Sequence, residues 1–225
     1  MALCLAFRFP CYSQFLPDLQ AKTPAEYDAY LDALDGPVLE KGASFERAYP
    51  QSSLRLPVWE LMARHWRSQG NREQAISAAE RGLTLAPDYI PLLVELADLL
   101  ANGAHRLDRA EQAAGYALQL LDRAKAPLRI APEAWVSAVA KLRARAYAAI
   151  GMAQFKRDDL AGAVKAFRAA LTAGAEDDPV LHYRLGRLYA LKGQIVEARS
   201  ELEQAALSPD PVLRDRARAA LAALK

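Results

Sequence analysis

Residues 178–209 read DPVLHYRLGRLYALKGQIVEARSELEQAALSP, which predicts two short amphipathic helices joined by a tight turn. Bulky residues on one stripe of each helix would fill the space between the two, and small residues would let the backbones approach closely. The residues at these positions are His182, Leu185, Gly186, Tyr189, Ala198 and Leu202, with Gly193 at the turn. A single hairpin cannot bury such a stripe, so the stretch predicts a stack of similar hairpins.

The same pattern recurs upstream at a nearly regular interval. The small residue that opens the second helix of each unit is found at Ala75, Ala110, Ala163 and Ala198. The intervals are 35, 53 and 35 residues, and the outer two are close to a repeat of about 34 residues. The longer middle interval predicts a local modification, which we place in an extended helix over residues 133–156.

The frame His182-x2-Leu185-Gly186-x2-Tyr189, followed by Ala198, resembles the tetratricopeptide repeat (TPR). This resemblance covers residues 56–225 and excludes the less regular N-terminal part. It implies an all-α fold, an α-α superhelix (TPR solenoid) of about five helical hairpins. The first hairpin is degenerate, and a C-terminal capping helix shields the last apolar surface.

We expect one superhelical domain after a short N-terminal tail. The apolar, irregular tail covers residues 1–21 and the domain covers residues 22–225. The hairpins are expected at about 22–50, 56–88, 90–126, 132–174 and 178–208, with the capping helix at 211–224.

Composition narrows the class of protein. An apolar content of 52% is ample for a core, and a net charge of +2 is too small to indicate nucleic acid or an anionic membrane as partner. The two cysteines, Cys4 and Cys11, have the spacing of neither a zinc pair nor a redox motif.

The N-terminal stretch MALCLAFRF is apolar but too short to span a membrane. It admits three interpretations: a disordered tail, a truncated or mis-started export signal, or an apolar strip that docks on the first hairpin. The compartment therefore stays open. The cytoplasm is the default expectation, and a periplasmic or exported protein is the alternative if this stretch is a truncated signal sequence.

The sequence offers little that could carry catalysis. His65, His105 and His182 lack metal-ligand spacing, and no nucleophile elbow or phosphate-binding loop occurs. The acidic clusters at residues 158–159 and 176–178 each precede a predicted helix, where carboxylates cap free backbone amides. We therefore expect no catalytic residue, no metal site and no cofactor, and we do not expect an enzyme.

The TPR resemblance implies a non-catalytic scaffold that mediates protein-protein interaction. In that family the first helix of each hairpin lines a concave groove, which holds an extended peptide or a partner helix. The positions that match the groove in this chain are Glu60, Arg64, Arg67, Asp98, Met152, Phe155, Tyr183 and Arg187. The resemblance gives the partner as a protein or peptide of unknown identity, with no small-molecule substrate.

An RNA-binding helical-repeat protein is the alternative. The 35-residue intervals also resemble those of pentatricopeptide RNA-binding repeats, which are paired helices as well. Basic residues gather at 123–129, 141–145 and 214–218, but they are not interleaved with the exposed aromatic side chains on which bases would stack. The frame around Leu185 and Gly186 favours the TPR interpretation, and RNA ranks second.

Overall fold

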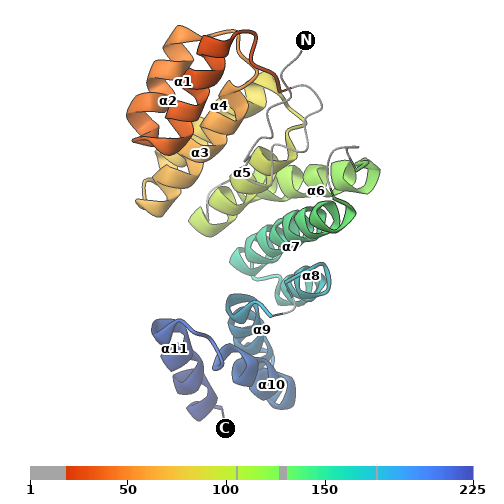
Figure 1. Ribbon diagram of the computed structural model, residues 1–225. Coiled ribbons are helices and arrows are strands. Elements are labelled where there is room, and N and C mark those ends of the chain that lie inside the picture. Colours follow the sequence, from red (N-terminus) through yellow and green to blue (C-terminus); the bar gives the residue numbers. More distant parts are fainter. Residues whose placement is uncertain (1–18, 105, 127–130, 176, 225) are drawn as a thin grey trace.

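The computed structural model describes residues 19–104, 106–126, 131–175 and 177–224, and every regular element within these ranges is a helix. Figure 1 shows the helices following one another as successive antiparallel pairs along an elongated chain. Their bounds are α1 Pro24–Asp35, α2 Val38–Ala48, α3 Arg55–Ser68, α4 Arg72–Leu85, α5 Ile90–Gly103, α6 Leu107–Arg123, α7 Pro132–Lys156, α8 Leu160–Thr172, α9 Pro179–Leu191, α10 Ile195–Ala205 and α11 Pro211–Ala222.

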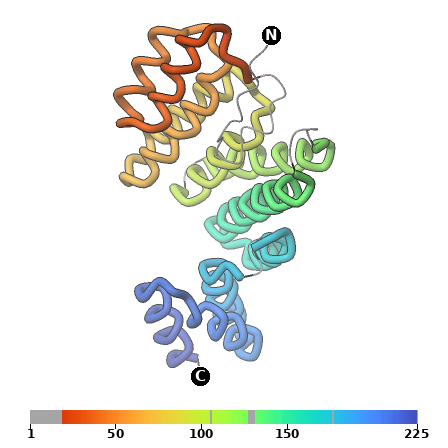
Figure 2. Tube along the Cα trace, in the orientation of Figure 1, coloured from red at the N-terminus to blue at the C-terminus, as the bar shows by residue number. Residues whose placement is uncertain are grey.

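The architecture is the predicted α-α superhelix of about five hairpins with a terminal helix. Each pair packs mainly on itself and on its neighbours in sequence, which is how a solenoid is stabilised. The trace in Figure 2 places the first hairpin and α11 at opposite ends of the molecule. Residues 1–18, which hold most of the expected N-terminal tail and the stretch with three alternative interpretations, lie outside the described residues.

Small side chains set the spacing between paired helices, as the repeat pattern predicts. The four alanines of the repeat frame, Ala75, Ala110, Ala163 and Ala198, are all fully buried. Gly186 faces Leu202 so closely that a Cβ atom built on it would lie 2.6 Å from the Leu202 Cγ. The turn between α9 and α10 is made at Gly193, whose φ of 73° is a left-handed conformation that favours glycine.

The first hairpin departs from the repeat frame but still builds a core. The ring centroids of Tyr30 on α1 and Phe45 on α2 lie 6.1 Å apart in an edge-on arrangement. Both side chains are buried together with Leu54 and Val58, so this hairpin packs onto α3. Burial and the nearby Glu60 carboxylate raise the pKa of the Tyr30 hydroxyl, which stays protonated at neutral pH.

Helix α7 is the extended helix that the long middle interval predicts. Its 25 residues span about 38 Å at 1.5 Å per residue. It packs against α5, α6 and α8, so one helix joins the third hairpin to the fourth. Figure 1 shows α7 running across the middle of the molecule between α6 and α8.

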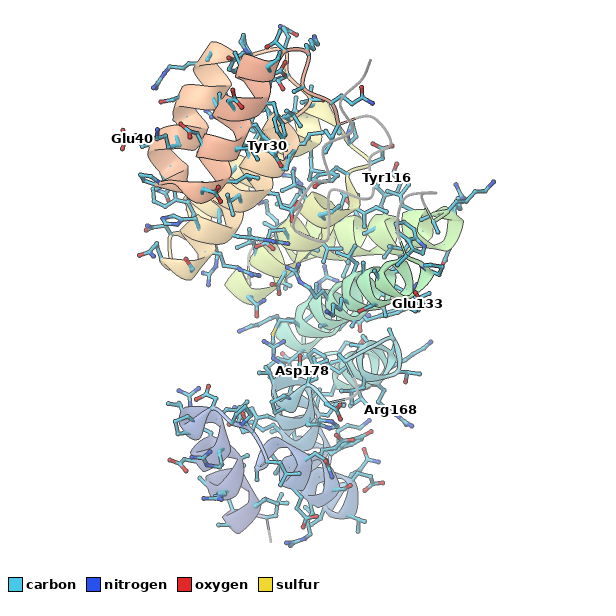
Figure 3. All side chains as sticks on the ribbon, in the orientation of Figure 1. Tyr30, Glu40, Tyr116, Glu133, Arg168 and Asp178 are labelled. Atoms are coloured by element: carbon cyan, nitrogen blue, oxygen red, sulfur yellow. The ribbon has the colours of Figure 1, made fainter. Side chains whose placement is uncertain are left out.

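Aspartate side chains cap the N-termini of α8 and α9, as expected of the acidic clusters. The Asp159 carboxylate accepts a hydrogen bond from the Gly162 amide at 2.8 Å, at the start of α8. At the start of α9, Asp178 accepts from the Val180 amide at 2.8 Å and from the Leu181 amide at 3.3 Å. Figure 3 shows Asp178 where the chain enters α9. Glu176 lies outside the described residues.

Replacing this cap tests its contribution to the fold. We expect Asp178→Ala to lower the free energy of unfolding by about 1 kcal/mol, because two amides of the first turn lose their acceptor. Asp177→Ala, at an exposed neighbouring position, is the matched control and should leave stability unchanged. Chemical denaturation of the two variants measures the difference, and equal stabilities would show that the cap contributes nothing.

Candidate functional site

The eight residues expected on the binding face fall into two groups in the structure. Glu60, Arg64, Arg67 and Asp98 lie on α3 and α5, within a network of ion pairs. Met152, Phe155, Tyr183 and Arg187 line one pocket between α7 and α9. The first group is largely occupied by its own contacts, and the second is open.

Glu60 departs from the expectation of an accessible groove residue, because its side chain is buried. The Tyr89 hydroxyl donates a hydrogen bond to Glu60 Oε2 at 2.6 Å. Arg64 Nη2 lies 2.7 Å from Glu60 Oε1, one helical turn away. Glu60 therefore holds α3 against the start of α5 and presents no free carboxylate to a partner.

The surroundings of Glu60 and Tyr89 raise the pKa values of both side chains. Burial raises the pKa of the Glu60 carboxyl, and Arg64 and the hydrogen bond from Tyr89 offset part of that rise. Burial and the Glu60 carboxylate raise the pKa of the Tyr89 hydroxyl well above its ordinary value. Tyr89 thus remains a hydrogen-bond donor throughout the physiological range.

Arg67 and Asp98 belong to a second ion network, centred on the buried Glu95. Arg67 Nε lies 3.3 Å from Glu95 Oε1, and Arg67 Nη1 donates to Asp98 Oδ2 at 3.0 Å. Arg145, on α7, donates to Glu95 Oε2 at 2.7 Å. The network connects α3, α5 and α7, so its charged groups stabilise the stack of helices.

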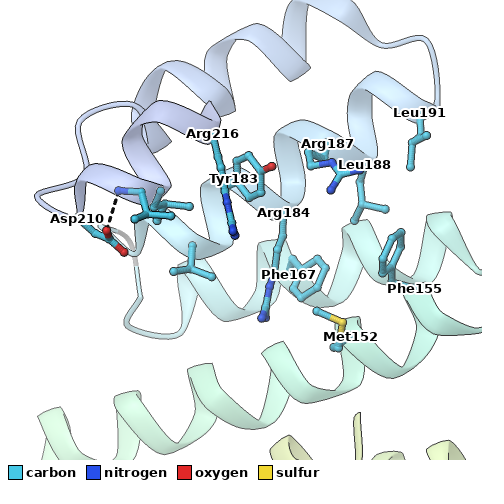
Figure 4. Close-up of a pocket in the computed structure, with 13 residues that line it drawn as sticks. Met152, Phe155, Phe167, Tyr183, Arg184, Arg187, Leu188, Leu191, Asp210 and Arg216 are labelled. Atoms are coloured by element: carbon cyan, nitrogen blue, oxygen red, sulfur yellow. Dashed lines mark hydrogen bonds between the residues drawn. The ribbon is translucent and has the colours of Figure 1, made fainter. Parts of the chain in front are cut away.

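A pocket of about 410 Å³ lies where α7, α9 and α11 meet. We call it the α7–α9–α11 pocket, and Figure 4 shows its side chains converging from these helices, with Phe167 contributed by α8. Its lining is mostly apolar and consists of Met152, Phe155, Phe167, Val180, Tyr183, Arg184, Arg187, Leu188, Leu191, Asp210, Val212, Leu213 and Arg216.

Large apolar side chains are exposed to solvent at the rim of this pocket. Leu191 is 61% exposed and Val212 is 57% exposed. Large exposed apolar side chains that gather around a pocket mark interaction sites more often than isolated ones do. The deeper part of the pocket contains Phe167 and Leu188, both of which are buried.

Three arginines give the pocket its charge. Arg184 lies 5.9 Å from the centre of the Phe167 ring, and Arg187 lies 6.0 Å from the centre of the Tyr183 ring, both within cation-π range. Arg216 extends from α11 toward Tyr183 (Figure 4). Asp210 is the single acidic residue of the lining, and its carboxylate accepts from the Val212 amide at 2.9 Å.

A second cavity of about 550 Å³ lies between α7 and the loop that leads into α9. It is lined by Lys141 and Arg145 on one side and by Asp177 and Asp178 on the other. Its charges are of both signs. Asp178 already caps α9, and Arg145 already pairs with Glu95. This cavity therefore offers a ligand less unpaired chemistry than the α7–α9–α11 pocket.

The repeat frame missed several residues of the α7–α9–α11 pocket. Arg184 lies two places after His182, outside the positions that the TPR pattern assigns to the groove. Val212 and Arg216 come from α11, which is not a repeat helix. The sequence signals that could have found the α11 residues are the apolar Val212 after the helix-starting Asp210-Pro211 pair and the basic run of Arg214, Arg216 and Arg218.

The histidines considered in the sequence as possible metal or catalytic residues are the remaining candidates. Nδ1 of His182 lies 2.6 Å from Oε2 of Glu201, between α9 and α10. His105 lies outside the described residues. Among the residues that the structure describes, no group of His, Cys, Asp or Glu side chains is arranged to hold a metal ion. Within the same residues, no helix combines the length and apolar character that crossing a membrane requires.

Comparisons with known proteins agree with this architecture. The family model described as "Tetratricopeptide repeat" matches residues 144–173, which cover the second half of α7 and all of α8. A solved structure of MamA (residues 41 to the end) from Desulfovibrio magneticus RS-1 aligns over 89% of this chain and 99% of its own, with 18% identity and a TM-score of 0.54. A thermophilic TPR protein from Thermus thermophilus aligns over 88% and 99%, with 19% identity and a TM-score of 0.52. No curated protein matches the sequence of this chain.

The solved structures and the family match agree on a fold of tetratricopeptide-repeat type. The solved structures, at these identities, support the solenoid fold alone. The family match identifies a tetratricopeptide repeat in the second half of α7 and in α8. This fold is that of a protein-interaction scaffold, and the family is generally non-catalytic.

Proposed function

We propose that this protein is a non-catalytic scaffold that binds an extended peptide or a single helix of a partner protein. The α7–α9–α11 pocket is the main contact for that segment. The observation that carries the proposal is the convergence of Met152, Phe155, Tyr183 and Arg187 with the exposed Leu191 and Val212 around one open cavity. Apolar pockets with a few polar groups at their edge are the usual sites of ligand recognition.

The ion networks on α3 and α5 argue against a contact centred there. Arg64 and Arg67 are held by Glu60, Glu95 and Asp98, so contacting a partner would weaken their pairing with the buried Glu60 and Glu95 carboxylates. A bound segment could still extend along these helices from the pocket. Its affinity would be about micromolar, near −8 kcal/mol, because ordering a flexible segment offsets much of the contact energy.

Site-specific photo-cross-linking tests this proposal. We place p-benzoylphenylalanine at Leu191 or at Val212 on the pocket rim, and at Val196 or at Leu207 as matched controls. The controls are 80% and 76% exposed and lie outside the pocket lining. Each purified variant is irradiated in an extract of the native source.

We expect the two rim variants to form the same discrete protein adducts and the control variants to form none of them. Pretreatment with nuclease should leave the adducts unchanged, because the partner segment is protein. Adducts from the controls alone, or the absence of a shared adduct at Leu191 and Val212, would contradict the proposed contact.

A further inference from the structure

The arginines of the α7–α9–α11 pocket differ from the paired arginines of the same fold. Arg145 has Glu95 at 2.7 Å, and Arg157 has Glu111 at 2.7 Å. Within the described residues, none of the pocket arginines, Arg184, Arg187 and Arg216, is within ion-pair distance of a carboxylate. Their charges therefore remain available to a ligand.

Of the three arginines, Arg184 would gain most from pairing with a carboxylate. Its side chain is half-buried beside Phe167, and its Nη2 donates only a long hydrogen bond of 3.4 Å to Asn102 Oδ1. Burial lowers the pKa of the Arg184 guanidinium, and the more distant Asp98 and Asp178 offset this only in part. A carboxylate bound in the pocket would compensate for the lost hydration of this cation.

The pocket combines this charge with an apolar floor. Three guanidinium groups face one carboxylate, that of Asp210, which already caps α11. Phe155, Leu188 and Leu191 also line the pocket, on the side of the arginines away from Asp210 (Figure 4), and they offer contact area to a bulky apolar side chain. Arginine binds carboxylates through two parallel hydrogen bonds, so the charges can also fix the orientation of a bound segment.

We propose that the α7–α9–α11 pocket selects an acidic amphipathic peptide segment, in which Asp or Glu side chains flank a bulky apolar residue. The apolar residue inserts between Phe155, Leu188 and Leu191, and the carboxylates pair with Arg184, Arg187 and Arg216. This inference rests on the proposed function and adds the chemistry of the segment. Nucleic acid fits the pocket less well, because aliphatic side chains form much of the floor and leave no continuous platform for stacking bases.

Selection from a random 16-residue peptide library displayed on phage tests the inference, with the full-length chain as bait. We expect the enriched peptides to be rich in Asp and Glu next to Leu, Ile, Phe or Trp. Synthetic copies of the strongest binders are then labelled, and their Kd is measured by fluorescence anisotropy. Glu→Gln and Asp→Asn versions of each peptide should bind about tenfold more weakly or worse, since charge-assisted hydrogen bonds are lost.

Matched variants of the chain locate the contact. The pocket variant carries Arg184→Gln, Arg187→Gln and Arg216→Gln, and the control carries Arg168→Gln, Arg199→Gln and Arg218→Gln at exposed positions outside the lining. Figure 3 shows Arg168 on the outer side of α8. We expect the pocket variant to lose about tenfold or more in affinity and the control to change less than about twofold. A variant with only the exposed Arg187 and Arg216 replaced gives the same test without altering the half-buried Arg184.

The outcomes separate this inference from the proposed function. Enriched peptides without an excess of acidic residues, or equal affinities for the pocket and control variants, would overturn the inference while peptide binding stands. Displacement of the peptide by poly-U RNA at equal charge concentration would assign the arginines to nucleic acid and overturn it as well. A selection that enriches no peptide would overturn both proposals.

Discussion

Gly186→Leu should lower the free energy of unfolding by about 3 kcal/mol, the upper end of the cost of overpacking. A Cβ at this position would lie 2.6 Å from Leu202 Cγ and 3.1 Å from the Ala198 carbonyl oxygen. Leu202 is buried, and the carbonyl belongs to the backbone of α10, so neither can move aside without separating α9 from α10. Thermal unfolding should show a fall in Tm of about 6–12 °C for a chain of this size.

Gly115→Leu is the matched control for this prediction. Gly115 lies within α6, and a Cβ built there meets nothing within 4 Å. Because leucine favours the helix over glycine by about 0.8 kcal/mol, this variant should be as stable as the parent or slightly more stable. Equal effects of the two substitutions would mean that close approach of α9 and α10 is not what Gly186 provides.

Arg145→Met should destabilise the fold by about 3 kcal/mol, because it removes the closest partner of a buried carboxylate. Glu95 is 1% exposed, and among the described residues Arg67, at 3.3 Å, is the ion-pair partner that remains once Arg145 is gone. Methionine preserves much of the side-chain volume, so the loss reports on the charge. Denaturant unfolding at neutral pH measures the effect.

Arg143→Met isolates the effect of burial from that of charge. Arg143 lies two residues away on the same helix, and its Nη1 is 2.6 Å from Oδ1 of Asp122, whose side chain is 63% exposed. Exposed pairs contribute less than about 1 kcal/mol, so this variant should nearly match the parent. A loss as large as that of Arg145→Met would show that the pairing with Glu95 has no special role in joining α5 to α7.

The ion network also revises an expectation about the binding face. Arg64 and Arg187 are both among the positions expected on the binding face, but charge reversal would act differently at the two. Arg64 lies 2.7 Å from the buried Glu60, so Arg64→Glu would place a second carboxylate against it and destabilise the fold. Arg187 is exposed in the pocket and remains the informative position of the two.

The helices and their order could be predicted from sequence, because the signals that define them are local. Thr23 and Pro24 begin α1, with the Thr23 hydroxyl accepting from the Glu26 amide at 3.1 Å. The 35-residue spacing of small residues relates α4 to α6 and α8 to α10. The longer middle interval predicts an extended helix over residues 133–156, and α7 is that helix.

The contacts between units could not be predicted in the same way. Arg145 and Glu95 are separated by 50 residues across the irregular interval, so no repeat spacing relates them. Glu60 occupies a position that faces the groove in the repeat pattern, but it is buried and accepts a hydrogen bond from the Tyr89 hydroxyl. The pocket depends on where α11 folds back against α9, and a capping helix has no place in the repeat frame.

Methyl NMR of the methionines tests the central claim most directly, that a partner segment binds between α7, α9 and α11. Met152 lines the pocket, whereas Met62 on α3 lies far from it, in the core near Gly42. With ¹³C-methyl methionine in the chain, titration with a selected peptide should shift the Met152 signal in a saturable manner and leave the Met62 signal in place. A Met152 signal that stays unchanged while the peptide binds, or a shift confined to Met62, would contradict the account.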